Sequence, residues 1–285
     1  MANTIDDIKD LVNDYMQQEK IAVFIGAGVS ALSNYPSWSE LIIKMAKKLK
    51  YPIKLKDKEG NDCLSSDEFL KIPQIYYDKF GEKKYFKFVR KELHILKEPN
   101  DIHKLIMQLK PNHILTTNYD TLIEQTANQV GISYSVINAD DKVATAPTRN
   151  YILKVHGDFE TNNIVLKERD YLDYENNFQL MDNLMKSIIS THLVIFIGYG
   201  LNDYNIKLIL NWVKHAQNGG FIEPIFIYTG KQELSDIELL YFEGERLQVL
   251  DANKLVKEFG DNPYYDKYQA SLLALLNSER TEKWY

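Results

Sequence analysis

Four segments of this chain place glycines or polar side chains directly after an apolar, strand-like run. These positions are Gly26, Ala27, Gly28 and Ser30; Thr116, Thr117, Asn118 and Asp120; His156, Gly157 and Asp158; and Gly198, Tyr199, Gly200 and Asp203. In an open parallel sheet the ligand binds outside the carboxyl ends of the strands, so these positions would share one site. An amide, an imidazole and a carboxylate beside a phosphate-binding turn suit cleavage or transfer at a ribose carbon.

The first segment, IAVFIGAGVS from Ile21 to Ser30, predicts a strand, a glycine turn and then a helix. Gly26 permits a tight turn, and Gly28 lets backbone N–H groups approach a pyrophosphate. Ala31 completes a G-x-G-x-x-A spacing. A dehydrogenase would carry an acidic residue about 20 positions further on, to bind a ribose hydroxyl. A lysine-rich stretch, Lys44 to Lys58, occupies that place, which argues against a standard dehydrogenase.

Each polar position also has a simpler interpretation. Asn118 and Asp120 could cap the helix that follows them. His156 could be a hydrogen-bonded histidine at a strand end, and Gly198 with Gly200 could form a plain tight turn. It is their joint occurrence after four strands that favours a site. Histidine is the side chain best suited to proton transfer near neutral pH. The N-glycosidic bond of NAD breaks through an oxocarbenium-like transition state, in which a nearby base can orient and deprotonate a hydroxyl or a water.

Composition restricts the function classes. The net charge is −6, and lysine and arginine are interspersed with the acidic residues, so no nucleic-acid surface is expected. Cys63 is the only cysteine, which excludes a disulfide framework and a cysteine-based zinc site within the chain. The acidic N-terminus does not resemble a signal peptide, and no apolar run approaches the roughly 20 residues of a membrane helix. We therefore expect a soluble, cytoplasmic protein.

The remaining pattern predicts the fold class. Strands are expected at residues 113–118, 133–137, 151–157, 193–200, 224–230 and 246–251, and helices at 4–19, after residue 118, at the end of 164–191, after residue 200 and at about 264–276. Apolar strands alternating with helices indicate a doubly wound, mainly parallel, Rossmann-like α/β sheet. Residues 39–110 are mainly helical without a clear strand, and we expect them to form an inserted helical layer within one domain of residues 1–285.

Three motifs give the chain a family resemblance. GAGVS at Gly26 to Ser30, TTNYD at Thr116 to Asp120 and VHGD at Val155 to Asp158 resemble the signature segments of sirtuins, in the same order. The chain is most similar to bacterial defence-associated sirtuins, through SSDEFLKIPQIYY, LKVHGDF and IFIGYGLNDYNI as well. The NAD hydrolase of the Thoeris system is a more distant relative. The resemblance covers nearly the whole chain and implies the sirtuin type of Rossmann-like fold.

The resemblance also implies roles for single residues. The dinucleotide-binding loop would comprise Gly26, Ala27, Gly28 and Ser30. Further NAD contacts would come from Thr117, from Asp120 at the nicotinamide amide, and from Gly198, Tyr199 and Gly200, where sirtuins more often carry a serine or threonine.

Asn118 and His156 match the two catalytic residues of the family. Asn118 would position the nicotinamide ribose and a water, and His156 would transfer the proton.

Two departures bear on the reaction. Protein-deacylating sirtuins carry a four-cysteine zinc module, which one cysteine cannot build. They also have a Pro-Asp-Phe-Arg segment after the glycine turn, where this chain has Tyr35-Pro36-Ser37-Trp38. We therefore expect no zinc, no cofactor beyond NAD as substrate, and acyl-peptide chemistry to be in doubt.

The leading hypothesis is an NAD glycohydrolase that releases nicotinamide and ADP-ribose and depletes NAD during anti-phage defence, by abortive infection. The alternatives are a zinc-free protein deacylase or ADP-ribosyltransferase, and a catalytically silent NAD- or ADP-ribose-binding module. The resemblance implies a homo-oligomer, a dimer or tetramer, with a sensor region or phage-protein activator outside this chain. Neither nucleic acid nor a membrane is an expected partner.

Overall fold

The computed structural model describes residues 4–57, 59–93, 96–161, 163–200, 222–256, 260 and 262–276. Its centre is a seven-stranded sheet in the order β5-β6-β4-β1-β7-β8-β9, and every neighbouring pair is parallel. The strands are β1 (Ile21–Ile25), β4 (His113–Thr116), β5 (Ser135–Ile137), β6 (Tyr151–Lys154), β7 (Leu193–Ile197), β8 (Ile225–Tyr228) and β9 (Gln248–Asp251). The predicted doubly wound, mainly parallel sheet is confirmed. The helix expected after Gly200 lies outside the described residues.

The central strand is β1, which has five apolar residues that are all buried. It pairs with β4 on one side and with β7 on the other. After β1 the chain forms β4 beside it, then the edge strand β5, and then β6 between those two. It then crosses to the other side of β1 and forms β7, β8 and β9 in turn. Such a reversal of strand order leaves a crevice at the carboxyl ends of the two central strands, where ligands bind in doubly wound sheets.

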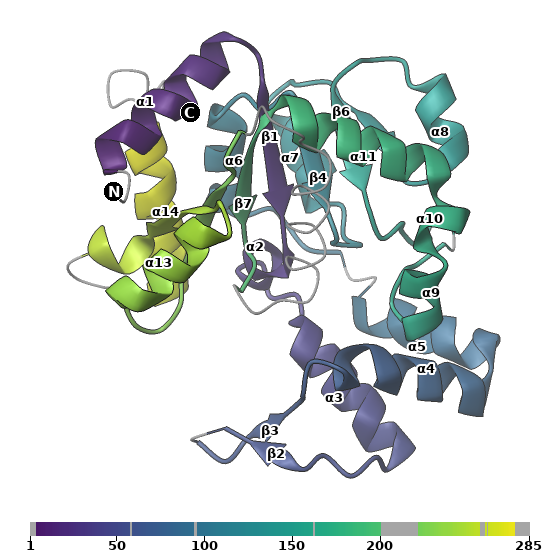
Figure 1. Ribbon diagram of the computed structural model, residues 1–285. Coiled ribbons are helices and arrows are strands. Elements are labelled where there is room, and N and C mark those ends of the chain that lie inside the picture. Colours follow the sequence, from purple (N-terminus) through teal and green to yellow (C-terminus); the bar gives the residue numbers. More distant parts are fainter. Residues whose placement is uncertain are drawn as a thin grey trace.

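Helices cover both faces of this sheet (Figure 1). On one face, α1 (Ile5–Gln17), α6 (Asp101–Gln108), α7 (Leu122–Gln129) and α14 (Pro263–Leu275) share a core with Ile21, Val23 and Ile25. On the other, α10 (Tyr174–Asn177) and α11 (Gln179–Thr191) share a core with Ala22 and Phe24. Alternate residues of β1 thus enter opposite cores, because successive side chains of a strand point to opposite faces.

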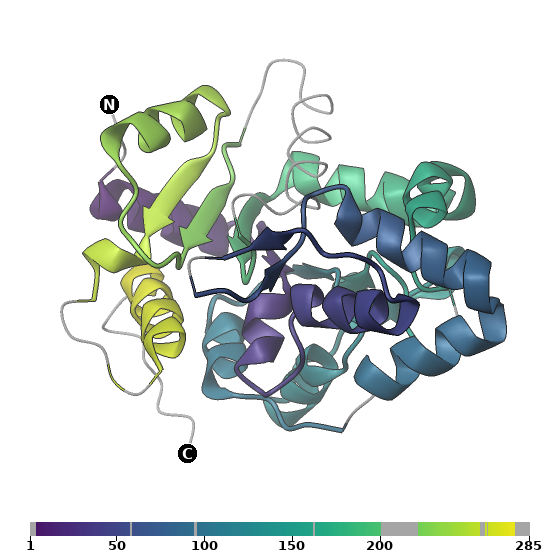
Figure 2. The same cartoon turned by 90° about the horizontal axis from the view of Figure 1, so that it is seen from below.

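A third core lies in a separate helical layer below the carboxyl ends of the central strands (Figures 1 and 2). The layer consists of α3 (Trp38–Leu49), α4 (Glu68–Phe80) and α5 (Glu82–Leu93). Aromatic side chains of α4 and α5, including Tyr76, Tyr85 and Phe88, pack against one another inside it. These aromatics therefore serve as internal packing of the layer.

The layer differs in two ways from what the sequence led us to expect. A short antiparallel hairpin, β2 (Leu55–Lys56) and β3 (Asp62–Cys63), stands where we expected no strand. Helix α6 falls within residues 39–110, yet it packs in the sheet core rather than with α3–α5.

Several short elements were also not anticipated. They are α8 (Asp140–Thr145), α9 (Glu168–Leu172), α13 (Asp236–Gly244) and the 3-10 turn η1 (Ala252–Lys254). The helix expected after the first glycine turn is present as the short α2 (Ala27–Ala31), with Gly26 as its N-cap residue. Across the described part of the chain, no helix has both the length and the apolar character that crossing a membrane would need.

Candidate active site

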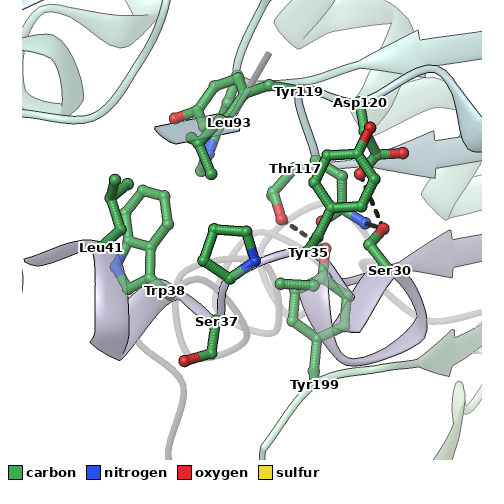
Figure 3. Close-up of a pocket in the computed structure, with 14 residues that line it drawn as sticks. Ser30, Tyr35, Ser37, Trp38, Leu41, Leu93, Thr117, Tyr119, Asp120 and Tyr199 are labelled. Carbon is green, nitrogen blue, oxygen red and sulfur yellow. Dashed lines mark hydrogen bonds between the residues drawn. The ribbon is translucent and has the colours of Figure 1, made fainter. Parts of the chain in front are cut away.

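A pocket of about 620 Å³, including its part open to solvent, lies at the carboxyl ends of β1, β4, β6 and β7. Its lining consists of Ala27, Ser30, Tyr35, Pro36, Ser37, Trp38, Leu41, Leu93, Thr117, Asn118, Tyr119, Asp120, His156 and Tyr199. Figure 3 shows Trp38 and Leu41 on one side, and Ser30 and Asp120 on the other. The sheet therefore supplies a polar wall, and the helical layer supplies an apolar one.

The two glycine turns are bonded directly to each other. The Gly26 amide donates to the Ile197 carbonyl at 2.8 Å, and the Gly28 amide donates to the Gly198 carbonyl at 2.9 Å. A Cβ on Gly28 would lie 2.9 Å from the Gly198 carbonyl oxygen and 2.7 Å from the Tyr268 hydroxyl. Gly198 itself has φ +84°, a conformation that favours glycine. Close packing of the two turns is thus one reason for these glycines, and a role at a pyrophosphate stays a prediction.

Replacing Gly28 with alanine is expected to destabilise the fold by about 1–3 kcal/mol, because the methyl group overpacks against backbone. Urea denaturation of the two proteins measures this loss. Gly244→Ala is the matched control, since nothing described lies within 4 Å of a Cβ there. Unchanged stability of the Gly28 variant would show that the turns can move apart.

A hydrogen-bonded chain joins three of the expected site residues. The Asn118 side-chain amide donates to the Gly26 carbonyl and to the Ser30 hydroxyl, both at 3.0 Å. The Ser30 hydroxyl donates to the Asp120 carboxylate at 2.8 Å. Because both donors of the Asn118 amide are used, its orientation is fixed. The other Asp120 oxygen accepts the Leu122 amide, the first amide of α7, at 3.1 Å, while the N-cap residue of that helix is Thr121.

The turn after β4 is held by hydroxyl groups. The Thr116 hydroxyl donates to the Ile25 carbonyl at 2.8 Å and accepts the Asn118 backbone amide at 3.0 Å. The Thr117 hydroxyl lies 3.0 Å from that of Tyr199, which in turn donates to the Ile25 carbonyl at 3.2 Å. These contacts connect β1, β4 and β7 at the polar wall of the pocket.

His156 reaches the same pocket from β6 and is 5% exposed. Its Nδ1 is buried without a hydrogen-bond partner among the described residues. The ring centres of His156 and Tyr171 lie 5.3 Å apart, and the two rings are nearly perpendicular. Burial lowers the pKa of His156 to about 3, so the imidazole is neutral at pH 7 and able to accept a proton.

The loop after His156 is built around Gly157 and Asp158. Gly157 has φ +68°, and a Cβ there would lie 2.2 Å from the Asn163 side-chain oxygen. The buried Asp158 carboxylate accepts the Asn138 side-chain amide at 2.8 Å and the Glu160 backbone amide at 2.9 Å. Both residues thus shape the loop below His156.

The apolar wall comes from the start of α3. Trp38 stacks on Tyr119, with ring centres 6.5 Å apart. The Tyr119 hydroxyl donates to the Val165 carbonyl at 2.7 Å, which fixes its ring. Burial, aided by the Asp120 charge, raises the pKa of Tyr35 to about 12, so this pocket residue keeps its phenolic proton.

Most of the expected residues therefore line the pocket or form the turns beneath it. Seven line the pocket: Ala27, Ser30, Thr117, Asn118, Asp120, His156 and Tyr199. Gly26, Gly28 and Gly198 form the paired turns beneath it, Gly200 is exposed beside them, and Asp203 lies outside the described residues. The sequence did not predict that Tyr119, Leu41 and Leu93 line the pocket, although Tyr119 lies inside the TTNYD motif.

Within the ranges that the structure describes, no group of three or more His, Cys, Asp or Glu side chains is arranged to hold a metal ion.

The buried histidines predict an acid-sensitive fold. Burial lowers the pKa of His103 and His113 to about 4, as it lowers that of His156 to about 3, from ordinary values of about 6.5. Each is neutral when folded and binds a proton more readily when unfolded. The free energy of unfolding is therefore highest above pH 6.5 and falls as the pH drops toward 4, by up to about 1.4 kcal/mol per pH unit for each fully buried histidine. Urea denaturation at pH 7, 6 and 5 measures this free energy of unfolding. A free energy that stays constant over that range would contradict the burial of these histidines.

Comparison with known proteins gives matches of two kinds. Residues 112–250 match the family model of a SIR2-like domain. Over 98% of its length the chain is 40% identical to Defense-associated sirtuin 2 of Bacillus subtilis, of which it spans 28%. Over 73% of its length it is 28% identical to NAD(+) hydrolase ThsA of Cytobacillus dafuensis, of which it spans 41%. The chain thus spans less than half the length of these relatives.

A solved structure of a Sir2 enzyme has the same fold. It matches 95% of this chain and 97% of its own with a TM-score of 0.50, at 13% sequence identity.

Proposed function

This chain is a SIR2-like protein of the defence-associated sirtuin group, and from that premise we propose that it hydrolyses NAD to nicotinamide and ADP-ribose. The observation that carries the proposal is the meeting of Asn118 and His156, from neighbouring strands, in one pocket with Ser30 and Asp120. Similar proteins that carry the name NAD(+) hydrolase support it. We take residues 1–285 as one hydrolase domain, with α3–α5 as its inserted layer.

The proposed chemistry uses atoms of these side chains that remain available to the substrate. The Asn118 amide nitrogen is occupied by Gly26 and Ser30, so its oxygen remains to accept a hydrogen bond from a ribose hydroxyl or from the attacking water. The neutral imidazole of His156 accepts the proton released as water adds to the ribose carbon. Departure of nicotinamide leaves positive charge on the ribose ring, and the nearby Asp120 carboxylate favours that charge.

NAD would lie with its nicotinamide end toward Trp38 and Tyr119 and its phosphates toward the paired glycine turns. The apolar wall of Trp38, Leu41 and Leu93 then excludes bulk water from the reacting bond. We assign Ala27, Thr117, Tyr199 and Gly200, together with the turn glycines Gly26, Gly28 and Gly198, to NAD binding rather than to proton transfer. No zinc or further cofactor enters this scheme.

One assay separates the hydrolase from the two alternatives. Purified protein is incubated with NAD alone and with NAD plus an acetylated peptide, and nicotinamide is quantified. Release that does not depend on peptide supports hydrolysis. Release that requires peptide supports a deacylase or ADP-ribosyltransferase. Release in neither arm with the activated state present, while calorimetry detects NAD binding, supports a silent binding module.

The role in the cell follows from the same reaction. We propose that NAD depletion in the cytoplasm halts an infected cell, in line with the name of the Bacillus subtilis relative. Such an enzyme must be held inactive, and we propose homo-oligomeric assembly, as a dimer or tetramer, together with a sensor region or phage protein beyond these 285 residues.

The helical layer of α3–α5 is the gate in this proposal, since its first helix forms one wall of the pocket. Light scattering and NAD turnover over a protein dilution series test it. A monomer with full, concentration-independent turnover would rule it out.

A further inference from the structure

A buried lysine connects the two strands that carry Asn118 and His156. Lys154 is the last residue of β6, lies two positions before His156 and is 0% exposed. Its ammonium donates to the Asp120 carbonyl at 2.6 Å, to the Tyr119 carbonyl at 3.4 Å and to the Glu124 carboxylate at 2.9 Å. An ammonium has three donors, so its hydrogen-bonding capacity is used up by these oxygens.

All three oxygens belong to the segment that follows β4. Asp120 and Tyr119 lie in the loop that carries Asn118, and Glu124 lies in the first turn of α7. Thr116 is the register partner of Lys154, so the lysine stands level with the end of β4 and its side chain extends under the loop. The Lys154 side chain thereby fixes the position of the Asn118 loop relative to the strand that carries His156.

Stability alone does not explain a charge at this place. Removing an ammonium from water costs several kcal/mol, and a buried ion pair commonly contributes no more to stability than an apolar pair of similar volume. What the ammonium adds is a fixed position for the loop. Its three donors are all satisfied only when the two carbonyls and the carboxylate converge on it. Displacement of a reacting group by about 1 Å can reduce a rate by about a hundredfold.

We propose that Lys154, together with Glu124, is a positioning pair that holds the Asn118–Asp120 loop in register with His156. The inference rests on the proposed NAD hydrolysis, because it concerns the geometry of that site. Neither side chain lines the pocket, so the pair acts through the loop and not by touching NAD.

The test replaces both members, Lys154→Met with Glu124→Gln, so that no unpaired charge stays buried. We expect a melting temperature close to that of the unchanged protein, a kcat for nicotinamide release reduced by about ten- to a hundredfold, and a KM for NAD changed by less than about threefold. Hydrogen–deuterium exchange of peptide 116–122 is expected to be at least about tenfold faster. This second readout does not depend on activity.

The matched control is Lys186→Met with Asp182→Asn. That pair also joins a lysine to a buried aspartate, at 2.5 Å, but it lies within α11 and not beside the loop. We expect its kcat and the exchange of peptide 116–122 to equal those of the unchanged protein.

The outcomes distinguish the positioning role of Lys154 and Glu124 from the proposed NAD hydrolysis. A folded double variant with unchanged kcat and unchanged exchange overturns the positioning role. If the double variant does not fold, Glu124→Gln alone is measured, and a kcat reduced by about three- to tenfold with faster exchange is expected, whereas unchanged values overturn the role. If the unchanged protein releases no nicotinamide even in its assembled, activated state, the proposed function fails, and the exchange measurement still decides whether the pair holds the loop.

Discussion

Replacing His156 with alanine is expected to reduce nicotinamide release by about 10²–10⁴-fold, the usual range for losing a group that transfers a proton. The imidazole is buried, lies in the pocket beside Asn118 and is neutral at pH 7, as a proton acceptor must be. No described neighbour bonds its Nδ1, so the truncation leaves no hydrogen-bond partner unpaired there. Steady-state kinetics with NAD measures the change, and circular dichroism checks the fold.

His192→Ala is the matched control for His156. This histidine precedes β7 and contacts the His113 ring at the opposite, amino-terminal edge of the sheet. We expect its turnover to equal that of the unchanged protein. If the His156 variant kept more than half of the normal rate, proton transfer by this residue would be excluded.

The pH–rate profile gives an independent check on His156. Because burial lowers its pKa to about 3, the rate should not fall as the pH is lowered from 7 to 5. A fall centred near pH 6.5 would mean that the imidazole titrates as an exposed histidine does.

Replacing Asn118 with alanine is expected to lower kcat by about a hundredfold through lost orientation of the ribose and water. The change also removes the hydrogen bonds to the Gly26 carbonyl and the Ser30 hydroxyl, which join β4 to the turn after β1. Steady-state kinetics separates lost orientation, which lowers kcat, from poorer NAD binding alone, which raises KM.

Asn112→Ala is the control for Asn118. Its side-chain oxygen accepts the Ile21 amide at 3.2 Å, so it bridges the same two strands at their other end. We expect kcat to be unchanged in this variant. A raised KM with unaltered kcat in the Asn118 variant would make Asn118 a binding residue only.

Much of the fold could be predicted because its signals are local. The run from Ile21 to Ile25 is apolar throughout, as a strand buried on both faces must be, and the glycine turn follows it directly. The alternation of such strands with helices predicted the parallel sheet, and the motifs predicted the relationship to defence-associated sirtuins, which the comparisons confirm.

The prediction was weaker wherever distant residues decide the outcome. The bond from Asn118 to Gly26 joins residues 92 positions apart, and no local pattern announces it. Lys154 looks like an ordinary surface lysine in the sequence, because only the folded chain brings Glu124 and two loop carbonyls to it. The helical character of residues 39–110 was predicted, but nothing local indicated that α6 belongs to a different core from α3–α5.

The place of β1 in the sheet also has a consequence for protein synthesis. This strand is made first and ends at Ile25, yet the partners on its two sides begin at His113 and Leu193. At about 5–20 residues per second, the ribosome needs roughly ten to thirty seconds to progress from β1 to β7. During that time this wholly apolar strand has no complete sheet to enter and is a natural target for chaperones. A nascent chain that lacks β7 also lacks the second glycine turn and Tyr199, so the pocket assembles only late in translation.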